Sequence, residues 1–317
     1  MFRIRRTTAM MPRRPSKRWS PLWLAPVFLL AACGGGGGGS GGGGSEGNGN
    51  NTNVQNTGTN TGSNTGNTST GNTSNPPEPL PPAPAAPVEI KLLALYSPGV
   101  ADQFSDPVLR IQHITNVAND VVDNSGGDFQ FSLVATHVVE YPDDLPVDQA
   151  LDDVTYNHHP AFASVPALRD SYQADVVVLV RPYANDGRCG LAWIGGYQQN
   201  GNFSNPAEAD FAFSVVGSNC SDYTLLHELG HNLGLAHSRR ESPDGGTYPY
   251  AVGHGEDNKF VTIMASTGEY NAPRLPLLSS PAIQCDGSPC GIDYQQPNGA
   301  DAVQALSVTA RQVAGYR

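Results

Sequence analysis

Apolar positions in the second part of the chain alternate between the period of a strand and the period of a helix. Val88–Tyr96 is a short apolar run rich in branched residues, and it predicts a strand. Apolar side chains then recur every three to four positions through Val108–Asn124, which predicts a helix. Phe129–Val139 begins with alternating apolar and polar residues, the spacing of a second strand.

The pattern continues with shorter elements towards the middle of the chain. Residues 146–173 predict two short helices that are separated at His158-His159-Pro160. Asp175–Val180 is apolar on both faces, so we expect a strand in the centre of a sheet. Leu191–Ile194 and Phe211–Val216 predict two further strands. This order of elements favours the α/β (α+β) class, with helices packed on a mixed sheet.

Two more helices are expected near the end of the chain. Asp222–Leu233 carries a stripe of leucines at helical spacing, and Ser221 or Asp222 can cap its N-terminus. Gly234 is well placed to end this helix in the left-handed conformation. Asp301–Tyr316 shows the same apolar spacing and predicts a C-terminal helix.

Residues 1–33 differ from this body and resemble a targeting segment. A basic region ends at Arg18, and the apolar run Trp19–Ala32 is shorter than the roughly 20 residues of a membrane-spanning helix. The run ends in Leu30-Ala31-Ala32-Cys33, which resembles the lipobox of bacterial lipoproteins. We therefore expect an exported lipoprotein, lipidated at Cys33 and tethered to the outer surface of a membrane (outer membrane or cell surface). The alternative is an ordinary signal peptide cleaved near Ala32, which would give a secreted protein.

Residues 34–87 are predicted to be a disordered linker, and residues 88–317 a single folded domain. The linker passes from pure glycine through Asn/Thr/Gly repeats to a proline-rich stretch, with too few apolar residues to offset chain entropy. The chain has a net charge of −11, but its first 32 residues hold seven basic and no acidic residues. The remainder thus has 11 basic and 29 acidic residues, a net charge of −18 that argues against a nucleic-acid partner.

The sequence His227-Glu228-Leu229-Gly230-His231-Asn232-Leu233-Gly234-Leu235-Ala236-His237 carries the chemistry. Its first two histidines are four residues apart, so a helix places both imidazoles on one face. Glu228 is rotated by about 100° and would contact a water molecule there rather than the ion. A turn at Gly234 would bring His237 back to the pair. Three imidazoles and one open position are typical of a catalytic zinc site.

This spacing predicts metal-assisted hydrolysis. One Zn²⁺ would acidify water and polarise a scissile carbonyl, while Glu228 would act as the general base. The alternative is a helix whose His and Glu side chains only face solvent. The additional match of Gly234 and His237 to the extended motif argues against that alternative.

The extended motif resembles that of the metzincin zinc endopeptidases. It is followed 27 residues later by Met264 in the segment Thr262-Ile263-Met264-Ala265, which resembles the Met-turn beneath the metzincin zinc. The resemblance implies a mostly parallel twisted sheet, an active-site helix and a C-terminal subdomain with the Met-turn. It also implies a peptide substrate.

Other segments are similar to bacterial reprolysin-like (adamalysin-related) peptidases. Ser238 and Ser266 depart from that group, where Asp and often Tyr are found. The matching segments are Leu92–Pro98, Arg188–Ala192, Cys220, the Thr-Ile-Met sequence with Pro273–Pro276, and Val303–Arg317.

With Cys33 assigned to a lipid, four cysteines remain, an even number that predicts two disulfides in an exported chain. Of three possible pairings we expect Cys189–Cys220 and Cys285–Cys290. The second closes a tight loop, and the first would tie the edge-strand region to the start of the active-site helix. A second metal at these four cysteines is the alternative.

The acidic pairs Asp143-Asp144 and Asp152-Asp153 could ligate calcium. The favoured interpretation is that these carboxylates lie on a solvent-exposed face of the domain.

These observations together predict a monomeric, surface-tethered zinc endopeptidase. A polypeptide substrate is expected to lie extended along the edge strand near Gly190–Gly195. Residues around Pro273–Leu278 would wall the pocket beside the zinc and set its side-chain preference. The alternatives are a non-catalytic adhesin or binding module on a metzincin scaffold, and a zinc hydrolase of cell-wall peptides. The presence of Glu228 argues against the binding module.

Overall fold

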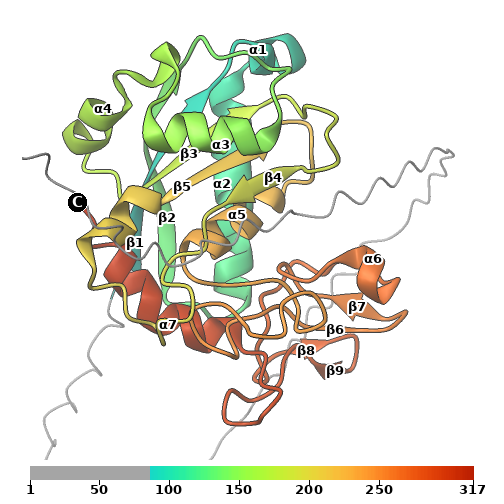
Figure 1. Ribbon diagram of the computed structural model, residues 1–317. Helices are drawn as coiled ribbons and strands as arrows, with labels where there is room; N and C mark the ends of the chain where they lie inside the picture. The colour runs from blue at the N-terminus through green and yellow to red at the C-terminus, as the bar shows by residue number, and fades with distance from the viewer. Residues whose placement is uncertain (1–85) are drawn as a thin grey trace, which may run out of the picture. The chain divides into compact units, whose positions relative to one another are not determined.

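The computed structural model describes residues 86–317 (Figure 1). The predicted targeting segment 1–33, its lipidation site Cys33 and all but the last two residues of the predicted linker 34–87 lie outside the described residues. Their assignment therefore stays a prediction. Within 86–317, no helix is both long enough and apolar enough to cross a membrane.

A five-stranded sheet forms the centre of the domain. It consists of β1 (Val88–Tyr96), β2 (Phe129–Val138), β3 (Val176–Arg181), β4 (Gly190–Ala192) and β5 (Phe213–Gly217). The strands lie in the order β2-β1-β3-β5-β4. All neighbours are parallel except β4, which runs antiparallel to β5 at one edge. The predicted mixed, mostly parallel sheet is confirmed, and β3 is its central, fully buried strand.

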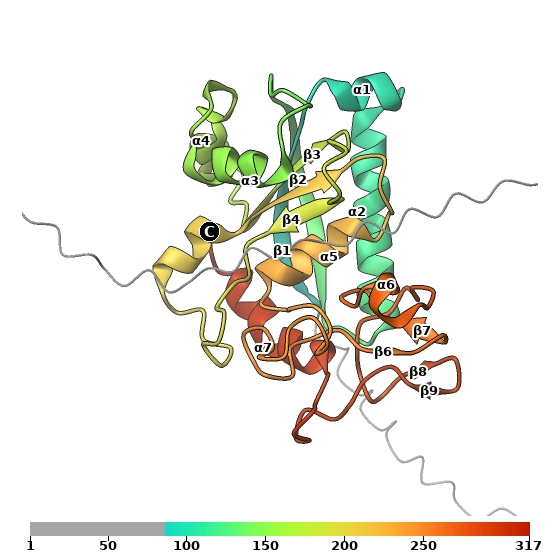
Figure 2. The same ribbon diagram turned by 45° about the vertical axis from the view of Figure 1, so that its right-hand side comes forward.

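Helices cover both faces of this sheet (Figures 1 and 2). Helices α2, α5 and α7 pack on one face, and α3 and α4 pack on the other. Short helices α1 and η2 precede α2 and β5, and η1 separates α3 from α4. The bounds are α1 (Gly99–Gln103), α2 (Pro107–Asn124), α3 (Val147–Tyr156), η1 (Pro160–Phe162), α4 (Val165–Ser171), η2 (Pro206–Phe211), α5 (Thr224–Asn232) and α7 (Ala302–Val313).

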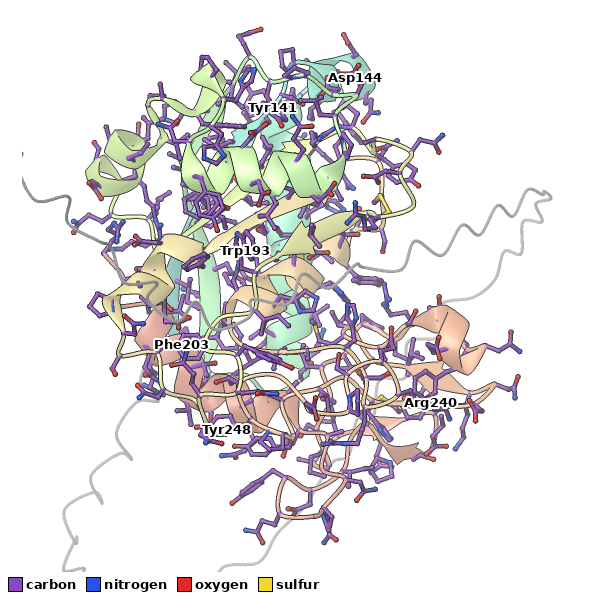
Figure 3. All side chains as sticks on the ribbon, viewed as in Figure 1. Tyr141, Asp144, Trp193, Phe203, Arg240 and Tyr248 are labelled. Carbon is purple, nitrogen blue, oxygen red and sulfur yellow. A yellow bond between two sulfur atoms is a disulfide. The ribbon has the colours of Figure 1, made fainter. Side chains whose placement is uncertain are left out.

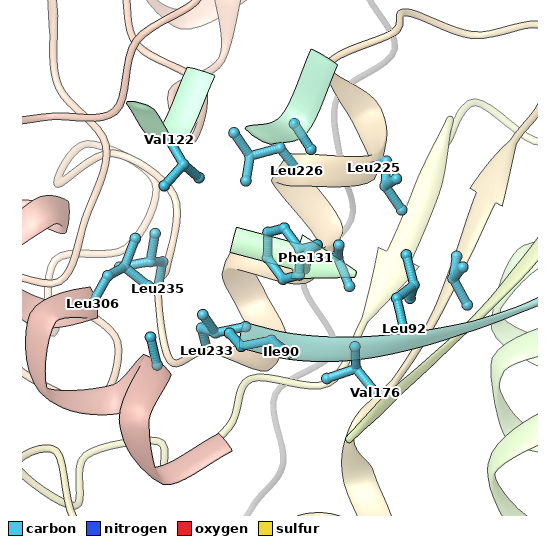
Figure 4. Packing of buried hydrophobic residues seen from close by; sticks show 14 of the residues in the cluster. Ile90, Leu92, Val122, Phe131, Val176, Leu225, Leu226, Leu233, Leu235 and Leu306 are labelled. Carbon is cyan, nitrogen blue, oxygen red and sulfur yellow. The ribbon is translucent and has the colours of Figure 1, made fainter. Parts of the chain in front are cut away.

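The two-residue period of the strands separates the core into two clusters. Leu92 of β1 lies in the cluster that contains α2 and α5, whereas Leu93 lies in the cluster on the α3 side. Figure 4 shows Leu92 with Leu225 and Leu226 of α5 in the first cluster. The leucine stripe predicted for the active-site helix therefore fastens that helix to the sheet.

The C-terminal subdomain is mostly irregular chain and lies below α5 in Figure 1. It contains two small antiparallel pairs, β6–β7 and β8–β9. The backbone of residues 261–277 is held by main-chain hydrogen bonds, such as Ile263 N–H to Leu277 C=O at 2.9 Å. The bounds are β6 (Gly255–Glu256), β7 (Phe260–Val261), α6 (Thr267–Tyr270), β8 (Gln284–Cys285) and β9 (Ser288–Pro289).

The start of α5 differs from the prediction. Tyr223 is the residue at the N-cap, and no side chain caps the helix. Asp222 instead pairs with Arg110 (2.5 Å) and His113 (3.1 Å) of α2, so its carboxylate is directed away from the helix end. The ion pair joins residues more than a hundred positions apart, and for this reason the local pattern did not indicate it.

Candidate metal centre

Helix α5 is held between the sheet and the C-terminal subdomain, and all nine of its residues are buried. At its C-terminal end the Asn232 side chain donates hydrogen bonds to the carbonyls of Trp193 and Phe213, each at 3.0 Å. These bonds fix the last turn of the helix beside β4 and β5. The histidines therefore stand on a helix whose position is set at several points.

A disulfide joins Cys189, directly before β4, to Cys220, in the loop before α5. The second disulfide, Cys285–Cys290, closes a short loop in the C-terminal subdomain (Figure 3). Both predicted pairings are confirmed. Because the four sulfurs are consumed in these bonds, the alternative of a second metal at the cysteines is excluded.

Gly234 reverses the chain after α5, as predicted. Its φ of +94° is in the left-handed region. The Leu235 N–H bonds to the Gly230 carbonyl and the Gly234 N–H to the His231 carbonyl, both at 2.9 Å, which is the Schellman pattern. A Cβ at position 234 would lie 2.7 Å from Thr247 Cγ2, so both conformation and space require glycine. The reversed chain brings His237 back to the helix.

The three histidines of the motif meet. One ring nitrogen from each of His227, His231 and His237 lies within 4.8 Å of the others, and each residue is at most 5 % exposed. His227 Nδ1 is 2.9 Å from the Ile263 carbonyl and His231 Nδ1 is 2.8 Å from the Leu235 carbonyl. Because a carbonyl only accepts hydrogen bonds, both Nδ1 atoms carry the proton and both Nε2 atoms present a lone pair.

These lone pairs fit a metal ion. His227 Nε2 lies 3.1 Å from His237 Nε2, and His231 Nε2 is buried without a hydrogen-bond partner in the described structure. Converging buried acceptors are costly unless a cation satisfies them. Nitrogen ligands at about 2.0–2.1 Å from a tetrahedral ion lie roughly 3.4 Å apart, close to this spacing. Within residues 86–317 no other group of three His, Cys, Asp or Glu side chains has the required geometry.

The electrostatics keep the imidazoles neutral, which is the form that binds metal. Burial, followed by the charges of the neighbouring histidines, lowers the pKa of His227 well below its usual value. Burial and then His237 lower the pKa of His231 to about 3, and burial and then Arg274 lower the pKa of His237 to about 4. The triad is therefore a metal-binding site.

Glu228 is fully buried beside the triad. Neither carboxylate oxygen has a hydrogen-bond partner in residues 86–317, and burial raises its pKa well above the usual value, with Arg274 acting in the opposite sense. Its Oε1 would lie 2.5 Å from a Cβ at Gly190 of β4, so the carboxylate packs on the backbone of the edge strand. The need for glycine at position 190 was not apparent from the sequence, because it depends on this contact between distant segments.

Met264 lies under α5. It is 1 % exposed, and a Cβ at Gly230 would be 2.8 Å from its sulfur. The neighbouring Ile263 supplies the carbonyl that orients His227. The structure thus brings the predicted Met-turn residue against the helix that carries the histidines.

From the sequence, Arg274 was noted only as part of Pro273–Pro276, a segment similar to reprolysin-like peptidases. In the fold, its Nη2 donates to the Ala265 carbonyl at 3.0 Å, directly after the Met264 turn. Its charge acts on His227, Glu228 and His237. No local pattern indicated this position, because it follows from the path of the C-terminal subdomain.

One carboxylate of each acidic pair considered for calcium accepts hydrogen bonds from the protein. Asp143 accepts from Ser97 Oγ at 2.5 Å and from the Gly99 N–H at 3.1 Å. Asp153 accepts from the Tyr141 hydroxyl at 2.8 Å. These carboxylates are thus used to hold the loop and helix on the α3 side of the sheet.

Known proteins resemble this chain in sequence and in fold. A Peptidyl-Asp metalloendopeptidase of Pseudomonas aeruginosa is 30 % identical over 252 residues, which cover 73 % of this chain and 41 % of the relative. A protein of the same name from Xanthomonas campestris is 34 % identical over 158 residues, 49 % of this chain and 34 % of the relative. The chain thus spans less than half the length of these curated relatives.

A solved structure titled "Structure of a chaperone-substrate complex" matches this chain with a TM-score of 0.56 and 23 % identity. The match covers 73 % of this chain and 35 % of the chain in the solved structure. At this identity the likeness concerns the fold alone. The profile of the reprolysin-like M12B metallopeptidase family matches residues 92–295, most of the described domain. This match confirms the resemblance expected from the histidine motif and Met264. The chain therefore belongs to the reprolysin-like M12B metallopeptidase family.

Proposed function

We propose that this protein is a zinc-dependent endopeptidase. The observation that carries the proposal is the convergence of three buried, neutral imidazoles from His227, His231 and His237 beside one buried carboxylate. Three histidines with an open position are the donor set of a catalytic zinc. Zinc bound there would supply a Lewis acid that activates water and polarises the scissile carbonyl.

Glu228 is the general base in this proposal. It follows His227 directly, so the helix directs its carboxylate to one side of the imidazoles rather than into the ligand set. The carboxylate accepts a proton from the attacking water and delivers it to the leaving amine, while the new carbon–oxygen bond replaces the carbon–nitrogen bond. Its burial beside Gly190 supports this role, because a desolvated carboxylate is a stronger base than a solvated one.

The substrate binds as an extended polypeptide along β4. This strand is the last in the order β2-β1-β3-β5-β4, so one of its backbone edges is not used by the sheet. A peptide that adds a strand there lies next to Glu228, because the carboxylate packs on Gly190 of the same strand. The Cys189–Cys220 bond supports this arrangement, since it ties the strand to the helix loop.

The names of the relatives supply a substrate class. Two relatives are called Peptidyl-Asp metalloendopeptidase. The region that matches the reprolysin-like family, residues 92–295, contains the whole histidine motif. We extend the proposal to polypeptides that carry Asp at the site of cleavage. The two disulfides of the domain support export to an oxidising compartment, in agreement with a lipid anchor at Cys33.

The proposal is tested by incubating the purified full chain with a denatured protein, with and without a chelator. We expect cleavage that the chelator abolishes and that added Zn²⁺ restores. Glu228→Ala should abolish cleavage, whereas Glu89→Ala, at an exposed position of β1, should not. Cleavage that survives the chelator or the loss of Glu228 would reject the proposal. One equivalent of bound metal without cleavage of any peptide would favour the binding module instead.

A further inference from the structure

The two serines that depart from the reprolysin-like pattern both contact Glu241. Ser238 Oγ donates to Glu241 Oε2 at 2.7 Å, and the Ser266 N–H donates to the same oxygen at 3.2 Å. Both serines are buried. Ser238 directly follows His237, and Ser266 is two positions after Met264. One carboxylate therefore joins the third histidine of the triad to the turn that contains Met264.

A tight turn returns Glu241 to His237. The Glu241 N–H bonds to the Ser238 carbonyl at 2.9 Å, the i to i+3 bond of a β-turn. In this geometry Glu241 Oε1 lies 3.8 Å from His237 Nδ1. The Glu241 side chain is 14 % exposed, so water and salt screen its charge less than that of a surface carboxylate. The negative charge therefore acts directly on the imidazole.

The two arginines in this turn serve other groups. Arg239 donates to three main-chain carbonyls. Arg240 forms a two-point ion pair with Asp257 (2.6 and 2.9 Å), and Figure 3 shows Arg240 on the C-terminal subdomain. Among the described residues, His237 is the only basic side chain in ion-pair contact with Glu241. The carboxylate is thus not neutralised by its nearest neighbours in the sequence.

The metal centre requires one tautomer of His237. Its Nε2 lies 3.1 Å from His227 Nε2, so this nitrogen belongs to the set that faces the ion. A neutral imidazole binds a metal through the nitrogen without a proton, so the proton has to be on Nδ1. In His227 and His231 a main-chain carbonyl accepts from Nδ1. No carbonyl in the described part of the chain does so for His237, and Glu241 lies on that side of the ring.

We propose that Glu241 is a positioning residue of the metal centre. Its carboxylate keeps the proton of His237 on Nδ1, so that Nε2 presents its lone pair to the metal, and it fastens His237 to the Met264 turn. A carboxylate beside the second ring nitrogen of a ligating histidine fixes the tautomer and raises the basicity of the ligand. Ser238 carries no charge, and Glu241 supplies the carboxylate from three positions further along the chain. This inference rests on the proposed zinc centre and adds a residue outside the histidine motif.

The test compares the zinc affinity of the full chain with that of its Glu241→Gln and Glu269→Gln variants. Gln keeps the size of Glu and an oxygen that can accept from both serines, but it lacks the charge. In competition with a chromogenic chelator, we expect Glu241→Gln to bind zinc roughly ten- to hundred-fold more weakly than the wild type. Glu269→Gln removes a charge at an exposed position of α6 and should leave the affinity unchanged.

A spectroscopic readout separates positioning of the ligand from support of the turn. With Co²⁺ in place of zinc, the visible absorption bands report the arrangement of the ligands, and they should shift in Glu241→Gln but not in Glu269→Gln. If Glu241 only supported the turn, Glu241→Gln would lower the Tm of the metal-free protein and leave the zinc affinity and the cobalt spectrum unchanged. That result would overturn the inference.

A second variant restores a carboxylate from the neighbouring position. Ser238 Oγ is 2.7 Å from Glu241 Oε2, so Ser238→Asp in the Glu241→Gln background places a carboxylate in the same region. We expect this double variant to recover part of the lost zinc affinity. An affinity that stays at the level of Glu241→Gln would contradict the role of the negative charge.

Zinc affinity is measured without a substrate, so this test does not depend on peptide cleavage. A wild type that binds zinc but cleaves no peptide would reject the peptidase proposal, while the affinities of the variants would still decide the role of Glu241. Failure of the wild type to bind zinc would overturn both.

Discussion

The carboxylate of Glu228 on α5 packs against the backbone of Gly190 on the edge strand β4. A Cβ at position 190 would lie 2.5 Å from Glu228 Oε1 and 2.8 Å from Cδ. The proposed base and the proposed substrate-binding strand are therefore in direct contact. Their relative position is maintained by the Cys189–Cys220 disulfide and by the bonds of Asn232 to Trp193 and Phe213.

Gly190→Ala should inactivate the enzyme without removing its metal. The added methyl group displaces the Glu228 carboxylate. A displacement of the general base by about 1 Å lowers kcat on the order of a hundred-fold. Metal content should stay at the wild-type value, because the three atoms nearest to the added methyl group all belong to Glu228 and none to a histidine. The matched control is Gly268→Ala, where a Cβ meets nothing within 4 Å. Wild-type kcat in Gly190→Ala would show that the contact with Glu228 is irrelevant to catalysis.

Gly234→Ala should weaken metal binding by displacing His237. The substitution meets both the left-handed conformation (φ +94°) and Thr247 Cγ2 at 2.7 Å. Gly126→Ala is the control, since Gly126 has a φ of +79° but nothing within 4 Å of the added Cβ. We expect both to lose about 1 kcal/mol of unfolding free energy from the backbone conformation. Only Gly234→Ala should also lose metal affinity in a competition with a chromogenic chelator. Equal metal affinity in the two variants would contradict the proposed role of the turn.

Removal of the Cys189–Cys220 disulfide by a double Ala substitution should affect both stability and activity. The bond spans 31 residues, and its loop-closure entropy corresponds to roughly 3–4 kcal/mol. Catalysis should also slow, because β4 and the loop before α5 lose their covalent tie. The double Ala variant of Cys285 and Cys290, which spans 5 residues, should lose roughly 2 kcal/mol and keep its kcat. Denaturant unfolding measures the loss of stability, and peptide kinetics measure the change in kcat. A similar kcat in the two double variants would contradict the proposal that the Cys189–Cys220 bond positions β4 for catalysis.

Alkaline conditions should destabilise the fold through Tyr250. Burial, followed by the charges of Tyr248, Asp301 and Tyr294, raises its pKa from 10.0 to about 12. Below pH 10 the phenol is neutral in both states, whereas between pH 10 and 12 only the unfolded chain ionises, so stability falls as pH rises. Tyr250→Phe should reduce this loss of Tm between pH 10 and 12. Tyr172→Phe, at an exposed position, should leave the dependence of Tm on pH unchanged. The same dependence of Tm on pH in the two variants would exclude the contribution of Tyr250.

The parts of the site that depend on neighbouring residues were predictable from the sequence. The leucine spacing of α5, the one-turn separation of His227 and His231, and the reversal at Gly234 are all local properties of one segment. A mixed sheet with helices packed on it also followed from the apolar patterns. Its mostly parallel character was implied by the family resemblance, and the order of its strands was not predicted.

The contacts that join distant segments were not predictable in the same way. Asp222 was expected to cap α5, but it pairs with Arg110 of α2, which only the fold brings near. Gly190 contacts Glu228 from the edge strand, and the charge of Arg274 in the C-terminal subdomain lowers the pKa of Glu228. Neither residue carries a local signal of this in the sequence. The segment around Cys33 remains a prediction from its sequence.

A metal held by His227, His231 and His237 and a base at Glu228 should act together on a peptide bond. Metal content and kcat, measured on the same preparations of wild type and Glu228→Gln, separate the two roles. We predict one equivalent of zinc in both proteins and a kcat lowered by roughly 10²–10⁴-fold in the variant. A variant that keeps one zinc and the wild-type kcat would show that Glu228 is not the base. A loss of activity that only follows a loss of zinc would show that Glu228 acts through metal binding alone.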